Sequence, residues 1–218
     1  MATLAFSSVT ARVLPYVTGC PIPVVEIAIR EAAIDFCERT HAWREDLTPI
    51  DVVDGTSSYA LAPAMPVVTG EVVVPLVVKH DSVVITPLDN ITVRVMYPDH
   101  PDTVNKSPPQ YYQFTEQQTI NLVPVPDTSV TGGLEIFAAV RPLRSATGMD
   151  SAVLTKWGWV VEAGALHRLC VMPGKNWSNP KLAEFFGRRF VSGCNTTNAE
   201  ARKGYTGRSL GVQMREFY

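Results

Sequence analysis

The hydrophobic pattern changes twice along the chain, from helical to extended and back to helical. Residues 23–39, "PVVEIAIREAAIDFCER", place one apolar stripe on a helix, with acidic side chains opposite it. The members of this stripe are Val25, Ile29, Ala32 and Phe36. Asp35 and Arg39 form an oppositely charged pair four residues apart, in the order that stabilises an exposed helix face. This segment is therefore predicted to be an amphipathic helix.

Two further apolar residues lie on the other side of the same predicted helix. Ile27 and Ile34 are seven residues apart and fall about 180° from the stripe. A helix with two apolar sides is either central in a bundle or in contact with a second subunit. We therefore take Ile27 and Ile34 as candidate residues of a subunit interface.

The middle of the chain has the short, turn-punctuated runs that are typical of strands. "DVVDGTSSYALA" contains an Asp-Gly turn, and "EVVVPLVVKHDSVVITPL" is rich in β-branched residues. Alternation in "NITVRVMY" predicts a further strand, and "TINLVPVP" and "LEIFAAVRP" complete the set. These runs predict an antiparallel β sandwich or barrel over residues 47–149.

Helical periodicity returns after residue 150 and is interrupted once, at an elbow. One helix is predicted within residues 152–171, and a second begins where Asn179 suits the N-cap and Pro180 the first helical position. Pro173 and Gly174 end the first helix, and Trp177 is expected to pin the connection onto the bundle. The buried stripes of the two helices are expected to be Leu154, Trp157, Val161, Ala165 and Leu169, and then Ala183, Phe186, Phe190 and Cys194.

Together these patterns predict an α+β protein of two domains. Residues 1–46 and 150–218 would form a discontinuous helical bundle, and residues 47–149 would be inserted into it as the β domain. The length of 218 residues and the 46% hydrophobic content suit one large core or a core with a satellite. No secretory signal or membrane span is visible in the sequence, so we expect synthesis in the cytoplasm.

Charge is distributed unevenly along the chain. Residues 1–155 carry 9 Lys and Arg against 17 Asp and Glu, whereas residues 156–218 carry 10 against 4. This polarity favours self-association, an acidic partner or nucleic acid, although two solvated faces of a monomer would also explain it. The basic, aromatic terminal segment "YTGRSLGVQMREFY" has no core-forming pattern, so a partner is expected to hold it.

Motifs that would indicate catalysis or cofactor binding are missing or incomplete. The Gly174-Lys175 pair lacks the earlier glycine and the following Ser or Thr of a phosphate loop. Cys37 and His41 have no second pair to complete a metal site, and the loop containing Asp99, His100 and Asp102 is too flexible a frame for catalysis. The four cysteines are widely spaced and are expected to be free and buried. We predict no catalytic residue, metal or cofactor.

Two helical blocks of sequence and two strand ends between them resemble the head-to-tail adaptor proteins of tailed bacteriophages, especially short-tailed ones. They are "GCPIPVVEIAIREAAIDFCERTHAWRED", "GALHRLCVMPGKNWSNPKLAEFFGRRF" and, less specifically, the strand ends "LVPVPD" and "AAVRP". The resemblance implies a structural, non-enzymatic virion protein at the head-tail junction. It would form a homo-oligomeric ring, dodecameric in this family, between the portal protein and a tail nozzle or tail tube protein.

The same resemblance assigns roles to parts of this chain. The C-terminal segment would reach into the portal, through the residues Tyr205, Arg208, Leu210, Met214, Arg215, Phe217 and Tyr218. The ring would contact genomic DNA non-specifically in its channel, and modest, distributed basic groups such as Arg188, Arg189, Arg202 and Lys203 suit this role, although the sequence does not say which of them face the channel. The alternatives are another virion component, such as a tail or capsid-decoration protein, and a virion-associated hydrolase.

Overall fold

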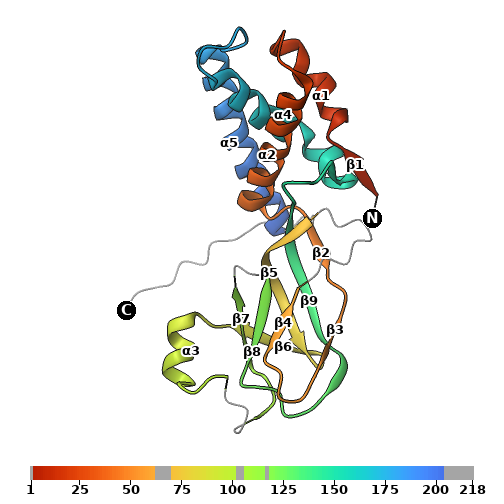
Figure 1. The fold of residues 1–218 in the computed structure, drawn as a ribbon, viewed down its shortest axis with the longest axis vertical. Helices are drawn as coiled ribbons and strands as arrows, with labels where there is room; N and C mark the ends of the chain where they lie inside the picture. The colour runs from red at the N-terminus through yellow and green to blue at the C-terminus, as the bar shows by residue number, and fades with distance from the viewer. Residues whose placement is uncertain (1, 62–69, 102–105, 116–117, 204–218) are drawn as a thin grey trace. The chain divides into compact units, whose positions relative to one another are not determined.

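The computed structural model describes residues 2–61, 70–101, 106–115 and 118–203, and the fold is α+β (Figure 1). The chain divides into two compact units. The β-sheet unit comprises Met1–Thr3 and Trp43–Asp150, and the helical unit comprises Leu4–Ala42 and Ser151–Tyr218. The sequence-based boundaries lie at residues 46/47 and 149/150, a few residues from these divisions.

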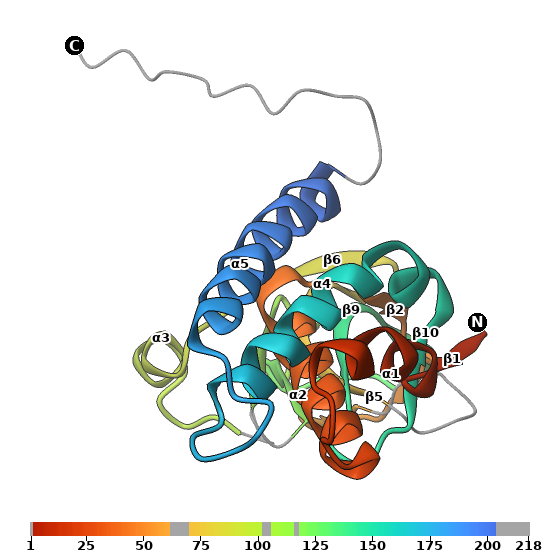
Figure 2. The same cartoon turned by 90° about the horizontal axis from the view of Figure 1, so that it is seen from above.

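The helical unit contains α1 (Ser7–Val13), the short 3-10 helix η1 (Leu14–Tyr16), α2 (Ile22–Thr40), α4 (Ser151–Val171) and α5 (Pro180–Lys203). Helix α4 packs against α1, α2 and α5, as Figure 2 shows from above. It is buried on several sides, which explains its glycines and alanines and its lack of a clean polar face.

The three long helices bury the side chains that their periodicity predicted. All members of the predicted α2, α4 and α5 stripes are buried, so these predictions are confirmed. Helix α2 ends at Thr40, and the next residue, His41, is left-handed (φ 50°) and donates its N–H to the carbonyl of Cys37. At the start of α5, the Asn179 side chain accepts from the N–H of Leu182, as an N-cap does.

The β-sheet unit is built on one curled mixed sheet with the strand order β2-β9-β5-β6-β7-β8-β4, and β3 also pairs with β9. The strands are β2 (Arg44–Asp46), β3 (Ile50–Val52), β4 (Ser58–Ala60), β5 (Gly70–His80), β6 (Val83–Pro87), β7 (Tyr111–Thr115), β8 (Thr119–Val123) and β9 (Val130–Pro142). The long strands β5 and β9 pair with two register shifts, one of them beside Pro75. Two further strands, β1 (Thr3–Ala5) and β10 (Gly148–Asp150), pair with each other.

Turn chemistry in this unit follows the sequence. Gly55, after Asp54, has a φ of 76°, as the predicted Asp-Gly turn requires. Asp81 and Ser82 join β5 to β6 with φ values of 47° and 65°, the signs of a type I′ hairpin turn. The core between the strands is apolar and includes the buried side chains of Val72, Ile120 and Leu134.

The curled sheet is barrel-like without being closed, in agreement with the predicted sandwich or barrel, but details of the β-sheet unit are corrected. The sheet is mixed rather than antiparallel, because β6 and β7 run parallel through Thr86–Tyr111 and Pro87–Tyr112. Strand β7 was not predicted. The segment "NITVRVMY" forms helix α3 (Asn90–Met96) instead of a strand.

Capping explains why α3 is a helix despite its β-branched residues. Asp89 is extended and accepts from the N–H groups of Ile91 and Thr92, both at 2.9 Å, and from the Thr92 hydroxyl at 2.6 Å. These bonds satisfy backbone donors that the first helical turn leaves free. The local hydrogen bonds therefore override a β propensity that depends on packing.

Candidate interaction surfaces of the helical unit

A groove with a volume of about 640 Å³ opens on the helical unit between α2, α4 and α5. Its apolar lining includes Val171, Phe190 and Val191, and its charged lining comprises Asp35, Arg39 and Arg168. Val171 and Val191 are both exposed, whereas Phe190 is buried. An apolar groove edged by charges is suited to receiving a partner's side chains.

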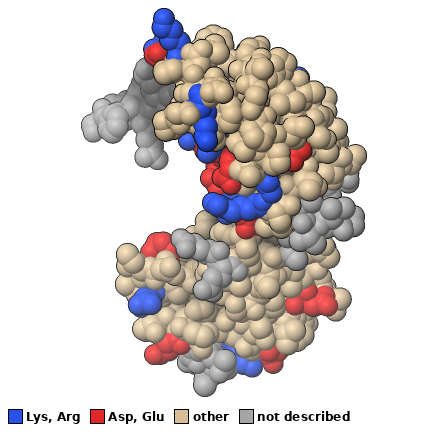
Figure 3. All heavy atoms as spheres, turned by 45° about the horizontal axis from the view of Figure 1, so that its top comes forward, with Lys and Arg blue, Asp and Glu red and all other residues tan. Residues whose placement is uncertain are grey.

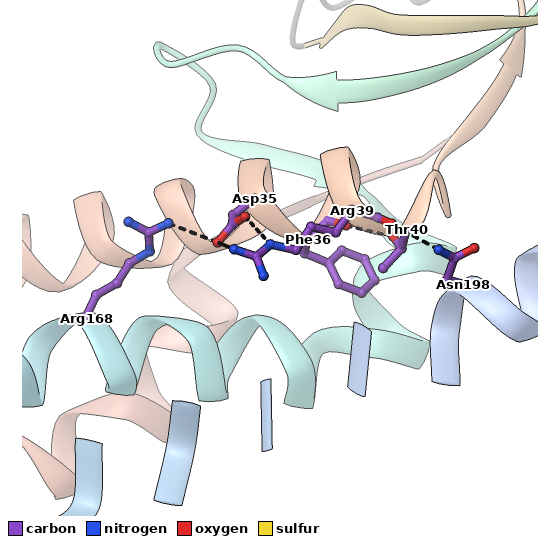
Figure 4. A network of polar contacts seen from close by, with 6 residues as sticks. All are labelled: Asp35, Phe36, Arg39, Thr40, Arg168 and Asn198. Atoms are coloured by element: carbon purple, nitrogen blue, oxygen red, sulfur yellow. Dashed lines mark hydrogen bonds and ion pairs between the residues drawn. The ribbon is translucent and has the colours of Figure 1, made fainter. Parts of the chain in front are cut away.

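The charged side of the groove is a three-residue network (Figure 4). Arg39 donates from Nε to Asp35 Oδ1 at 2.6 Å, and Arg168 donates from Nη2 to Asp35 Oδ2 at 3.3 Å. The hydrogen bond to Asp35 raises the pKa of Arg39, although burial opposes it. One carboxylate between two guanidiniums leaves the groove with net positive charge. Because the arginines are substantially exposed, the ion pairs contribute little to folding stability.

Backbone contacts at the end of α2 hold the network in place. The Thr40 hydroxyl donates to the carbonyl of Phe36 at 2.7 Å, and the side-chain amide of Asn198 donates to the carbonyl of Arg39 at 3.3 Å (Figure 4). The second bond joins α5 to α2. The guanidinium of Arg39 lies 5.6 Å from the centre of the Phe190 ring, which adds a cation-π contact.

Two glycines in the groove allow α4 and α5 to approach closely. A Cβ on Gly164 would lie 2.8 Å from the Phe190 ring, and one on Gly187 would lie 2.8 Å from His167 Nδ1. His167 Nδ1 itself donates to the carbonyl of Ala183 at 2.8 Å. The groove was not predicted from the sequence: the Asp35–Arg39 pair was visible, but nothing linked it to Arg168 or to the two glycines.

The predicted interface residues of α2 differ in their environment. Ile27 is 53% exposed, whereas only 8% of Ile34 is exposed. Of the two, Ile27 has the surface that contact with a neighbouring subunit requires. The interface role of both residues stays a prediction.

The predicted elbow lies between α4 and α5. Gly174 takes the predicted left-handed conformation, with a φ of 70°, and Pro180 is the first residue of α5. The N–H of Asn179 donates to the carbonyl of Cys170 at 3.0 Å, which closes the connection after Pro173. Trp177 is half-buried, and its Nε1 is buried with no hydrogen-bond partner among the described residues. Its ring centre lies 6.0 Å from the Lys175 ammonium.

The predicted basic residues of the helical unit are partly engaged by their own chain. Arg188 pairs with Glu184, and the Arg189 guanidinium lies 5.4 Å from the centre of the Trp159 ring. On the face shown in Figure 3, Lys and Arg side chains are scattered rather than gathered in one continuous patch. The predicted portal-contact residues, Tyr205, Arg208, Leu210, Met214, Arg215, Phe217 and Tyr218, lie outside the described residues.

Nucleophilic and metal-binding chemistry finds little support in the described part of the chain. All four cysteines are free and buried, as predicted. Burial raises the pKa of the Cys37 thiol, and raises that of Cys194 to about 11, so neither is a thiolate at neutral pH. Among the described residues, no group of three His, Cys, Asp or Glu side chains could hold a metal ion. None of their helices is both long and apolar enough to cross a membrane.

Comparison with known proteins gives a family assignment. None of the curated proteins compared with the chain matches it. Residues 5–203, which include nearly all of both units, match the family described as SU10 adaptor protein, a structural phage component. The chain therefore belongs to the SU10 adaptor protein family and is a phage adaptor protein.

Proposed function

We propose that this adaptor protein forms a ring at the head-tail junction of the virion, bound to the portal protein on one side and to a tail nozzle or tail tube protein on the other. The observation that carries the proposal is the family match, which covers residues 5–203 and so includes both units. By analogy with the short-tailed phage adaptors that the sequence resembles, the proposed ring is dodecameric.

The exposed apolar residues of the helical unit support lateral contact between subunits. Ile27 is exposed on α2, and Phe185 and Val191 are exposed on α5. These large apolar side chains, exposed on two helices of one unit, are available for such a contact. We assign Ile27 to the subunit interface, with Ile34 beside it on the same side of α2.

The C-terminal segment is proposed to dock on the portal. It follows the last residue of α5, Lys203, and contains aromatic, aliphatic and basic residues, a composition suited to a protein interface. Its proposed contact residues are the seven predicted from the sequence, from Tyr205 to Tyr218.

Genomic DNA is proposed to pass through the ring with only non-specific contacts. Arg188 is paired with Glu184, and Lys156 with Glu200 at 2.7 Å, so part of the positive charge is already neutralised. Tight binding needs many ordered cations, each displacing a counterion from a phosphate. Paired and scattered cations therefore suit passage better than retention.

The test is to image the full chain by negative-stain electron microscopy with and without purified portal. We expect a ring on the portal that is missing from portal alone. Deleting residues 205–218 should weaken docking and leave the circular dichroism of the free protein unchanged. Equal docking by the truncated protein would remove the proposed role of the tail. Binding to tail or capsid proteins but not to portal would instead favour another virion component.

A further inference from the structure

Helix α3 of the β-sheet unit exposes apolar side chains that a helix of a monomeric protein would bury. Ile91 is 77% exposed, Val95 is 76% exposed and Met96 is 52% exposed, whereas Val93 is buried. Ile91 and Val95 are four residues apart and therefore share one face of the helix. A cluster of exposed apolar side chains rimmed by polar residues marks a contact surface.

Acidic side chains flank this apolar cluster. Asp89 caps the N-terminus of α3, and Asp99 follows its C-terminus, while Arg94 is the one base on the helix. The hydrogen bond from the Thr92 hydroxyl lowers the pKa of Asp89, so its carboxylate is charged at neutral pH. We define the α3 surface as Asp89, Ile91, Val95, Met96 and Asp99; it is apolar, with acids at both ends.

The groove of the helical unit has the complementary chemistry. Its apolar rim residues Val171 and Val191 are exposed, and Arg39 and Arg168 give it net positive charge around Asp35. The two units as a whole also carry charge of opposite sign. Residues 43–150 carry 6 Lys and Arg against 13 Asp and Glu, and residues 4–42 with 151–218 carry 13 against 8. Long-range attraction therefore favours contact between unlike units of two copies.

We infer that the α3 surface of one copy docks in the groove of the helical unit of a neighbouring copy. Ile91 and Val95 would cover the apolar rim, and the flanking acids would face the two arginines. The inference rests on the proposed ring and names one of its subunit contacts.

The two surfaces belong to different units, so such a contact is heterologous. After one contact forms, each copy still has one unused surface, so assembly continues head to tail and forms a ring when the rotation between neighbours closes. A self-complementary patch would instead stop at a dimer. This geometry connects the inferred contact to the ring proposed above.

The test uses the full chain and two pairs of exposed positions. In the α3 variant, Ile91→Lys and Val95→Lys are combined; in the groove variant, Val171→Asp and Val191→Asp are combined. Matched controls place the same charge at exposed apolar positions outside both surfaces and outside the proposed α2 and α5 contacts, with Val83→Lys for the β-sheet unit and Ile22→Asp for the helical unit. Mass photometry measures self-association over a concentration series, with and without portal, and circular dichroism checks folding.

Each double variant should weaken association by about tenfold or more, because binding would bury a charge in an apolar contact. The controls should stay within about twofold of the wild type. A mixture of the two double variants retains one intact pair of surfaces, so it should form a one-to-one complex and grow no further.

Wild-type association by either double variant, or failure of the two folded variants to form the mixed complex, would overturn the inferred contact and leave the ring proposal intact. Absence of any wild-type assembly, even on the portal, would overturn the proposed function and this inference with it.

Discussion

The two units of this adaptor protein differ in how closely their surfaces follow their sequence patterns. In the helical unit, the stripes read at helical spacing are the buried faces of α2, α4 and α5. In the β-sheet unit, the alternating segment around Val93 is a short helix with its apolar side outward. A long apolar stripe predicts a helix reliably because many positions must share the helical period. In a segment of seven residues, by contrast, one capping side chain can determine the secondary structure.

The contrast also concerns function. The helical unit packs closely through glycines and buries most of its predicted apolar residues. The helical unit also exposes apolar side chains, Ile27 among them, but these lie off its predicted buried stripes, whereas the exposed apolar face of α3 lies where a strand was predicted. Departures from the expected pattern are therefore informative about contacts with other molecules.

The largest effect is expected at the centre of the helical unit. Phe36 is fully buried in α2, so Phe36→Ala should lower the free energy of unfolding by about 3 to 5 kcal/mol through lost burial and a cavity. Denaturant unfolding followed by far-ultraviolet circular dichroism measures this. Phe185→Ala, at an exposed position of α5, should cost less than about 0.5 kcal/mol. Similar losses for both would show that α2 is not central.

The elbow between α4 and α5 should be the next most sensitive position. Trp177→Ala should cost about 2 to 3 kcal/mol, because the half-buried indole packs the connection. Trp177→Phe should stay within about 1 kcal/mol of the wild type, because the buried Nε1 has no described partner to lose. Denaturant unfolding of both variants measures the two free-energy changes. If phenylalanine costs as much as alanine, the indole N–H must make a hydrogen bond.

Close packing of α4 on α5 can be tested with one methyl group. Gly164→Ala should destabilise the protein by about 1 to 2 kcal/mol, because the new Cβ would lie 2.8 Å from Phe190. Gly158→Ala in the same helix is the matched control: its Cβ would lie 3.1 Å from the flexible end of Arg12 and in ordinary contact with Leu154, at 3.9 Å. At this position the higher helix propensity of alanine should raise the free energy of unfolding by up to about 1 kcal/mol. A stabilising Gly164→Ala would contradict the packing.

The smallest effect concerns the cap that makes α3 a helix. Asp89→Ala should speed amide exchange in α3, whereas Asp89→Asn, which keeps an accepting oxygen, should change it less. The pKa of Asp89 is lowered in the folded protein, so its stabilisation is present above its ordinary pKa. It is lost as pH falls through the lowered folded value. The protection factors of the α3 amides, which correct for the intrinsic pH dependence of exchange, should therefore fall at acid pH in the wild type, and the asparagine variant should lack this fall.

Much of the architecture could be predicted because it depends on local patterns. The helical stripes, the Asn179-Pro180 helix start, the left-handed Gly174 and the Asp54-Gly55 turn each involve residues close in sequence. The order of strands could not be predicted, because the pairing of β6 with β7 joins residues 25 positions apart through a helix. Such pairing depends on tertiary packing rather than local propensity.

The candidate site shows the same limit. The Asp35–Arg39 pair could be read from its spacing, and Ile27 from its place on the helix. The groove could not be read from the sequence, because Arg168 donates to Asp35 across 133 positions of sequence. Gly164 contributes to the groove only because it lets Phe190 approach α4 closely. The exposed face of α3 was hidden by its resemblance to a strand.

The most direct test of the central claim is native mass spectrometry of purified portal mixed with the full-length chain. A ring of adaptors predicts a single complex whose mass exceeds that of the portal by an integral multiple of 23.9 kDa, twelvefold for the proposed dodecamer. Portal that gains no mass in the presence of folded protein, or that binds one or two copies without forming a ring, would contradict the account.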